Sequence, residues 1–187
     1  MPDDYSMVSV PKQGNNPGMP LGKKNILIIF DFDKVAEYVR DAKGVRITSF
    51  GMKTGVTPIG IFVDQNSIDC GDEVEGDAYA RGYLPHVNFD HPGAELAIAE
   101  FKANNVNTNL GVIVIPCDSA VTDVKVYGTP CAPLVMQAAN EQDTKEVHNN
   151  HFELKAEMRG YPIGIMAKTM VPATDSQDIN TFLGLGE

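Results

Sequence analysis

Short runs with the two-residue period of a β-strand recur along this chain, and turn residues separate them. The clearest is 152–159, in which Phe152, Leu154, Ala156 and Met158 alternate with four charged residues. Such alternation places apolar side chains on one face of a strand and charged side chains on the other. It predicts a sheet with one face on a core and the other in water.

Eight such runs lie in the middle of the chain, and their number and spacing are typical of a mainly β protein, a β-sandwich or a barrel. The predicted strands are 25–33, 57–64, 74–88, 111–117, 123–128, 132–139, 152–159 and 163–170. A chain of 187 residues is large enough for one such body with a single core. We therefore expect one β-rich domain over 25–171.

One segment, at about 92–105, has the pattern of an α-helix packed beside the strands. Pro92 falls in the predicted first turn, where its missing N–H costs nothing, and Asp90 or His91 could cap the helix. The apolar stripe of this predicted helix consists of Ala94, Leu96, Ala97, Ile98 and Phe101.

Three segments do not fit the strand pattern. Residues 1–24 hold four prolines and three glycines without a regular period, which predicts an extended N-terminal arm. Residues 172–187 are polar and predict a shorter C-terminal arm. The stretch 34–55 is long for a connection inside a compact domain, and we expect a projecting hairpin or a loop that contacts a neighbour.

The charge balance limits the classes of partner. The chain has 25 acidic and 15 basic residues, a formal net charge of -10. This balance argues against a protein that grips nucleic acid by neutralising its phosphates. The apolar runs are too short to cross a bilayer, so no membrane partner is expected, and the N-terminus lacks a signal-peptide pattern, which favours synthesis in a cytoplasm.

An apolar strand runs into Asp31 and Asp33, and this Asp-x-Asp pattern resembles the first motif of haloacid-dehalogenase-type phosphotransferases. The resemblance implies that Asp31 is a nucleophile and Asp33 a general acid, with Mg²⁺ beside them. That family also needs a parallel α/β core, which the strand pattern here does not predict. We favour a strand that ends in polar residues.

Other polar clusters have a structural interpretation that we favour over a chemical one. The acidic run 69–77 could bind Ca²⁺ but lacks the EF-hand spacing, so a solvated acidic turn is expected. The histidines do not have the spacing of a metal site, and those at 148 and 151 lie in an asparagine-rich, turn-like stretch. We expect no cofactor, no metal and no enzyme activity. The cysteines, expected to be buried or half-buried free thiols, are Cys70, Cys117 and Cys131.

A longer resemblance covers about 24–171 through the order of the predicted elements. It includes the turn Gly-Thr-Pro-Cys-Ala-Pro at 128–133, the single helix, and the alternating strand followed by Arg-Gly-Tyr-Pro at 159–162. In these features the chain resembles the major tail tube proteins of long-tailed bacteriophages, especially those of gut Bacteroidetes, which are related to the tubes of injection systems.

The resemblance implies a structural virion protein that closes, six to a ring, into stacked rings. Inner strands would join across subunits, the arms would clasp neighbours, and other tail proteins would bind the tube. DNA would pass through without specific binding, because an acidic lumen repels it. The implied location is the virion tail, assembled in the host cytoplasm. The alternatives are a ring component of a phage neck, a tail terminator or a contractile injection tube.

Two sets of residues are candidates for this function. The candidate luminal carboxylates are Glu73, Glu75, Asp77, Glu153 and Glu157. The candidate inter-ring contacts, in the stretch that matches the position of the family's stacking loop, are Val35, Tyr38, Val39, Ile47 and Phe50.

Overall fold

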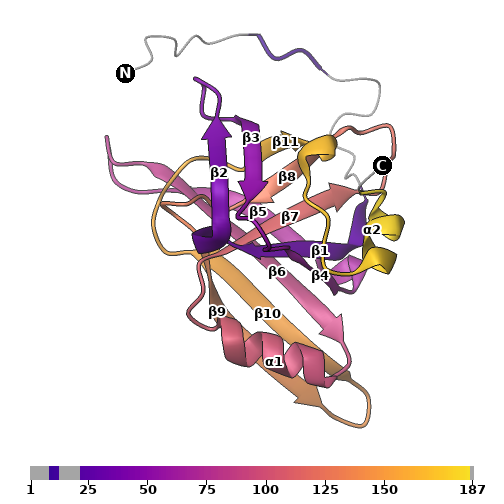
Figure 1. Cartoon of the computed structure of the whole chain (residues 1–187). Helices are drawn as coiled ribbons and strands as arrows, with labels where there is room; N and C mark the ends of the chain where they lie inside the picture. Colours follow the sequence, from indigo (N-terminus) through magenta and orange to yellow (C-terminus); the bar gives the residue numbers. More distant parts are fainter. Residues whose placement is uncertain (1–8, 13–21, 186–187) are drawn as a thin grey trace.

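The computed structural model describes residues 9–12 and 22–185 of the chain. It contains one mixed sheet of 11 strands (Figure 1). The strands are β1 (Lys23–Asp31), β2 (Val35–Arg40), β3 (Arg46–Met52), β4 (Ile59–Phe62), β5 (Asp69–Glu75), β6 (Gly82–Pro92), β7 (Leu110–Pro116), β8 (Asp123–Tyr127), β9 (Leu134–Asp143), β10 (His148–Ala156) and β11 (Gly164–Ala167). The helices are α1 (Leu96–Asn105), α2 (Gln177–Leu183) and the short 3-10 turns η1 (Phe32–Lys34), η2 (Gln65–Ser67) and η3 (Lys168–Met170).

The chain is mainly β, as expected. Its sheet is open, so the barrel alternative is wrong. Its strand order is β2-β3-β11-β8-β7-β9-β10-β6-β5, with β1 paired to both β7 and β4. Within the described sheet, only β3 and β11 pair in parallel. Because the path ends at β2 and β5, these strands have no neighbour in the described chain that would close a barrel.

The main core lies between two portions of this sheet. One portion holds β4, β1, β7, β8, β11, β3 and β2, and the other holds β9, β10, β6 and β5; they meet where Leu110 pairs with Leu134. Phe89 and Phe152 from the second portion stack at 5.0 Å between ring centroids. Helix α1 adds Phe101, whose ring lies 5.7 Å from that of Phe152. The sheet therefore packs on itself around an aromatic centre.

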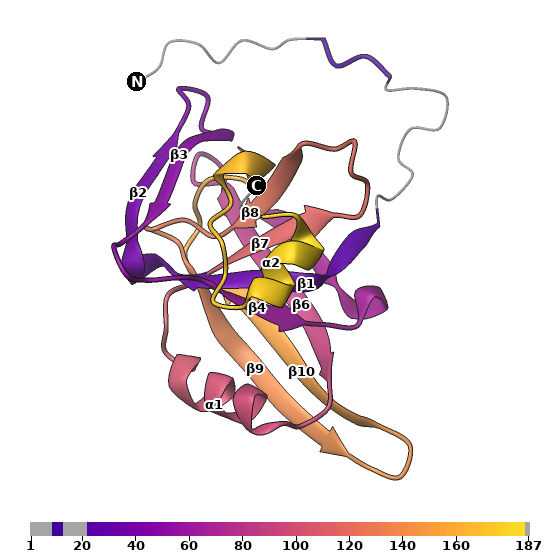
Figure 2. The ribbon, with the colours of Figure 1, turned by 45° about the vertical axis from the view of Figure 1, so that its right-hand side comes forward.

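A second core covers the opposite face of β1 and β7. Both strands are buried on both faces, which explains their uninterrupted apolar sequences. Leu183 of α2 and Leu185 after it complete this core and are 0% and 7% exposed. Residues 172–185 therefore do not form the expected arm, because this segment contains α2 and packs against the sheet of the same chain (Figure 2). The expectation of a single helix is wrong for the same reason.

The stretch 34–55 forms the antiparallel hairpin of β2 and β3, so the hairpin alternative is confirmed. Figure 1 shows this hairpin rising at one end of the molecule, away from α1. The hairpin is anchored because Ile47 is almost fully buried in the second core. Most of the predicted N-terminal arm, 1–24, lies outside the described residues, and Lys23 and Lys24 belong to β1.

Helix α1 begins at Leu96, four residues later than predicted. The preceding backbone continues as β6, and Pro92 is still paired with Asn149 of β10. The predicted caps Asp90 and His91 are therefore wrong, and Glu95 takes the N-cap position without a side-chain hydrogen bond. Of the predicted apolar stripe, only Ile98 and Phe101 are buried.

Strand β10 confirms the alternation at Phe152, Leu154 and Ala156, but Met158 is exposed because the strand ends at Ala156. The acidic run expected as a turn instead forms β5 as far as Glu75. The histidines expected in a turn lie on β10. The cysteines are free as expected, yet Cys117 and Cys131 are exposed rather than buried. No described helix has the length and apolar character needed to span a membrane.

Candidate functional site: the acidic face of β5, β6, β10 and β9

Strands β5, β6, β10 and β9 carry a polar surface on the side away from the main core, which we call the acidic face. Its residues are Asp69, Glu73, His86, Asn88, Asp90, Gln137, His151, Glu153 and Lys155. Strand register aligns them in rows, since Asp69 pairs with Asn88 and Asn88 pairs with Glu153. The two-residue period of each strand therefore gathers polar groups from segments far apart in sequence.

The centre of the acidic face is a shallow hollow of about 300 Å³. Its lining includes the carboxylates of Asp69, Glu73 and Glu153 and a single cationic side chain, Lys155. The Lys155 Nζ lies 3.5 Å from Glu73 Oε2. Because both side chains are well exposed, this ion pair contributes little to stability. The hollow retains an excess of negative charge.

A hydrogen-bonded histidine lies at one end of the acidic face. Nδ1 of His151 is 2.5 Å from Oδ1 of Asp90, and its Nε2 is 3.3 Å from Oε1 of Glu153. The bond to Asp90, with a smaller effect of Glu153, raises the pKa of His151 above its ordinary value against the opposing effect of partial burial. The two carboxylates therefore favour the protonated form of this histidine.

The predicted luminal carboxylates are all exposed, but they do not form a single cluster. Glu73 and Glu153 line the same hollow, and Glu157 accepts a hydrogen bond from Gln137 Nε2 at 3.3 Å. Glu75 ends β5, and Asp77 lies in the turn beyond it.

Sequence reasoning missed Asp69, His86, Asp90, His151 and Lys155 as members of this face. A partial signal existed for β5, because the acidic residues Asp69, Glu73 and Glu75 fall on alternate positions of a strand, although Gly71 and Asp72 interrupt the pattern. For the others, only the pairing of β6 with β10 brings the groups together.

The outer edges of this four-stranded group are open. In the described chain, β5 pairs with β6 alone, and β9 pairs with β10 and, at one residue, with β7. Successive pairings from β9 to β5 are antiparallel, so β5 and β9 run in opposite directions. A β5 edge from one copy could consequently continue the antiparallel pattern beside a β9 edge from another.

The turns of the β5–β6 and β9–β10 hairpins lie at opposite ends of the molecule (Figures 1 and 2). The β5–β6 turn is near the β2–β3 hairpin, and the β9–β10 turn is beyond α1. The four strands therefore span the molecule from end to end.

The candidate inter-ring residues differ in accessibility. Val39 is exposed, whereas Ile47 is buried in the second core. Val35, Tyr38 and Phe50 are half-buried and pack against that core. Burial raises the pKa of the Tyr38 hydroxyl, which also accepts hydrogen bonds from Arg40. Of the five, Val39 is therefore the side chain most available to another molecule.

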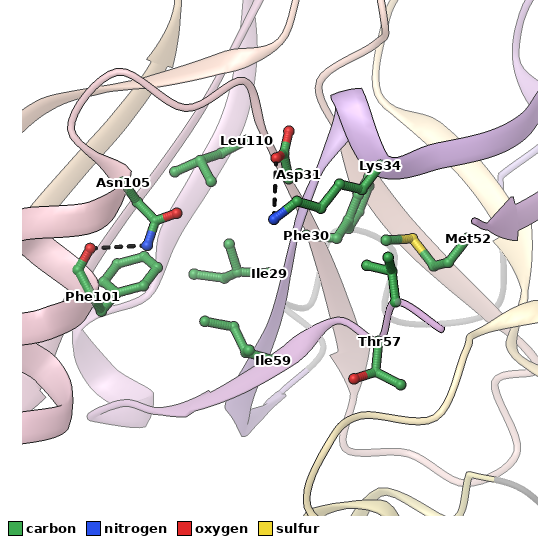
Figure 3. A pocket seen from close by; sticks show the side chains of 11 residues that line it. Ile29, Phe30, Asp31, Lys34, Met52, Thr57, Ile59, Phe101, Asn105 and Leu110 are labelled. Carbon is green, nitrogen blue, oxygen red and sulfur yellow. Dashed lines mark hydrogen bonds and ion pairs between the residues drawn. The ribbon is translucent and has the colours of Figure 1, made fainter. Parts of the chain in front are cut away.

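Asp31 lines a separate cavity of about 150 Å³, whose lining does not include Asp33 (Figure 3). Figure 3 shows Ile29, Ile59 and Leu110 lining it and Asp31 joined to Lys34, at 3.7 Å. The Asp31 side chain also accepts a bond from the Asp33 backbone N–H and caps η1.

Asp33 has different partners, since both of its carboxylate oxygens lie 3.2 Å from Asn109 Nδ2. Strand β1 pairs antiparallel with both β4 and β7, unlike a strand in a parallel α/β core. Over the described residues, no group of three histidine, cysteine or acidic side chains is arranged to hold a metal ion. The two carboxylates are engaged in local capping and hydrogen bonding.

In comparisons with known proteins, no family model, curated protein or solved structure matches this chain.

Proposed function

We propose that this chain is the ring-forming subunit of a phage tail tube and that its acidic face lines the lumen. The observation that carries the proposal is the four-stranded group, in which the outer edge of β5 is open and the outer edge of β9 pairs with β7 at one residue alone. Unpaired edges of this kind invite strand addition, and a head-to-tail contact between unlike edges closes a ring when the rotation per copy fits. In such a ring, the inner strands form one continuous antiparallel sheet.

The charge of the acidic face supports the second half of the proposal. The hollow holds Asp69, Glu73 and Glu153 against the single Lys155. Duplex DNA carries one negative charge per roughly 1.7 Å of its axis, so a wall of carboxylates repels it and does not retain it. A conduit needs this property, whereas a DNA-binding protein needs the opposite one.

The same edges would serve a ring in a phage neck, a tail terminator or an injection tube. These alternatives differ from a tail tube in whether rings stack into long tubes. For a tail tube, the partners are further copies of the chain and other tail proteins, and the location is the virion.

Negative-stain microscopy of a concentration series tests the proposal. We expect rings and stacked tubes with an open centre. Val74→Lys places a charge near the end of the open β5 edge, and because Val74 is 60% exposed the monomer should still fold. This variant should lose rings, whereas Val106→Lys, at a 51% exposed valine just after α1, should keep them. A wild-type chain that stays monomeric at all concentrations would contradict the proposal.

A further inference from the structure

His91 lies near the end of β6, between strand β4 and the start of helix α1. Its Nδ1 is 2.7 Å from the backbone oxygen of Phe62, and its Nε2 is 2.9 Å from Oε2 of Glu95. A carbonyl oxygen and a carboxylate oxygen both accept hydrogen bonds, and a neutral imidazole has one N–H to donate. Only the protonated ring, with a hydrogen on each nitrogen, therefore makes both bonds at once.

Glu95 meets His91 as a carboxylate. The hydrogen bond from His91 is the main cause that lowers the pKa of Glu95 below its ordinary value, so this side chain has no hydrogen of its own to give to a neutral ring near pH 7. A turn at Gly93, with φ of 106°, brings Glu95 back toward His91. A Cβ at Gly93 would lie 3.0 Å from Oε1 of Glu95, so the turn suits a glycine.

Other charged groups near this pair come from three further elements. They are Glu100 of α1, Asp175 before α2 and His148 of β10. Glu100 and Asp175 share with His91 a groove of about 420 Å³ between β4 and α1, and no lysine or arginine of the described residues lines it. His148 has its own partner, because its Nδ1 lies 3.1 Å from Oδ1 of Asp143. When His91 is protonated, it is therefore the cation of this groove.

Within the described residues, polar side-chain contacts fasten α1 to the sheet at two places. In its last turns, Lys102 Nζ lies 2.8 Å from Glu141 Oε2 and 2.6 Å from Asn150 Oδ1. At its start, Glu95 holds the N-cap position without a side-chain capping bond, and its carboxylate contacts His91 instead. Histidine is the side chain that ordinarily changes its charge between about pH 5 and pH 8, so only the second fastening is sensitive to pH in this range.

We propose that protonation of His91 is a switch that fastens the first turn of α1 to β4. The charged ring bridges Phe62 O and Glu95. When the ring loses one hydrogen, Nδ1 keeps its bond to Phe62 O, and Nε2 presents a lone pair to the Glu95 carboxylate. The Glu95 side chain is 68% exposed, so it turns to water and the first turn of α1 loosens. The switch lies within one chain and does not depend on the proposed ring.

The position of the hydrogen on neutral His91 tests this geometry in the unaltered chain. Imidazole ¹⁵N chemical shifts at pH 8 report which ring nitrogen carries it. We expect the hydrogen on Nδ1, because Phe62 O remains its partner. A hydrogen on Nε2 would overturn the inference, since the neutral ring would then still donate to Glu95. A ring that keeps both hydrogens at pH 8 would overturn it as well.

Amide hydrogen exchange measured by NMR tests the loosening itself. Ile98 N and Ala99 N both donate to Glu95 O, at 3.2 and 3.3 Å, and report on the first turn. Relative to the amides of 102–105, their protection should fall about two- to fivefold from pH 5 to pH 8, the range expected for an exposed ion pair.

Glu95→Gln is the matched variant, and it should fold because the side chain is largely exposed. Its amide accepts a bond from a protonated ring and donates one to a neutral ring, so the relative protection of Ile98 and Ala99 should no longer depend on pH. If the wild type shows no fall, or if the variant shows the same fall, the switch is wrong.

Discussion

Asp90 and His151 face each other across β6 and β10, with Asp90 Oδ1 2.5 Å from His151 Nδ1. They are register partners on the acidic face, so the strand pairing itself brings the acid and the base together. This bond is the main cause of the raised pKa of His151. The acidic face consequently carries a histidine whose pKa is raised above its ordinary value.

Asp90→Asn should lower the pKa of His151 toward its ordinary value, because a neutral amide does not favour the imidazolium. A pKa raised in the folded state adds stability below the unfolded value of about 6.5, and this contribution disappears as the pH rises through the folded value. The stability difference between the wild type and the variant should therefore shrink from pH 5.5 to pH 9. Histidine NMR titration and urea unfolding measure the two quantities; an unchanged pKa would contradict the assignment.

Asn180→Ala should destabilise the fold by about 1–3 kcal/mol, because it leaves buried groups of Thr174 without partners. Asn180 Oδ1 accepts from Thr174 N at 2.7 Å, and Asn180 Nδ2 donates to Thr174 O at 3.0 Å. Urea unfolding checks this value. Asn140→Ala, at an exposed asparagine, is the matched control and should change stability by less than about 0.5 kcal/mol.

Leu183→Ala should cost about 2–5 kcal/mol, because this side chain is fully buried in the second core. Phe182 is its neighbour on α2 but is 51% exposed, and its ring lies 5.1 Å from Lys24 Nζ. Phe182→Ala should therefore cost about 1 kcal/mol or less. Thermal unfolding of the pair measures the difference. Equal losses would mean that the C-terminal segment does not pack as described.

Glu73→Lys combined with Glu153→Lys should convert the assembled tubes into DNA binders. The double change replaces two carboxylates of the hollow with cations and leaves the strand edges unaltered. We expect salt-dependent binding of duplex DNA by the variant and none by the wild type, measured by fluorescence anisotropy. Glu37→Lys with Glu146→Lys makes the same charge change at exposed positions outside the acidic face. If this control binds equally well, the acidic face does not line the path of DNA.

The sequence was most informative where local pattern and final environment agree. Phe152, Leu154 and Ala156 alternate in the sequence and are buried on one face of β10. The uninterrupted apolar run of β1 also predicted a strand, although its burial on both faces depends on α2, which the sequence did not reveal. A seven-residue helix has a weak local signal, and its stability comes from Leu183 meeting a distant core.

Tertiary pairing decided the remaining differences. Pairing with β10 extends β6 through Pro92 and delays α1 to Leu96, against the helix-start signal at Pro92. Pairing with β6 also forms β5 from a glycine-containing acidic run with low strand propensity. The acidic face could be predicted only in part for the same reason. Asp90 and His151 lie 61 residues apart in the sequence, and only the register between their strands brings them together.

Hydrogen exchange with mass spectrometry, before and after assembly, tests the central claim most directly. In the monomer, the outer-edge amides of β5 have no strand partner in the described chain, and the outer edge of β9 has one only at Leu134, which pairs with Leu110 of β7. The other outer-edge amides of both strands should therefore exchange rapidly. We expect assembly to slow exchange in 69–75 and 134–143 together, because one edge pairs with the other. Assemblies that form without added protection in both strands would contradict it.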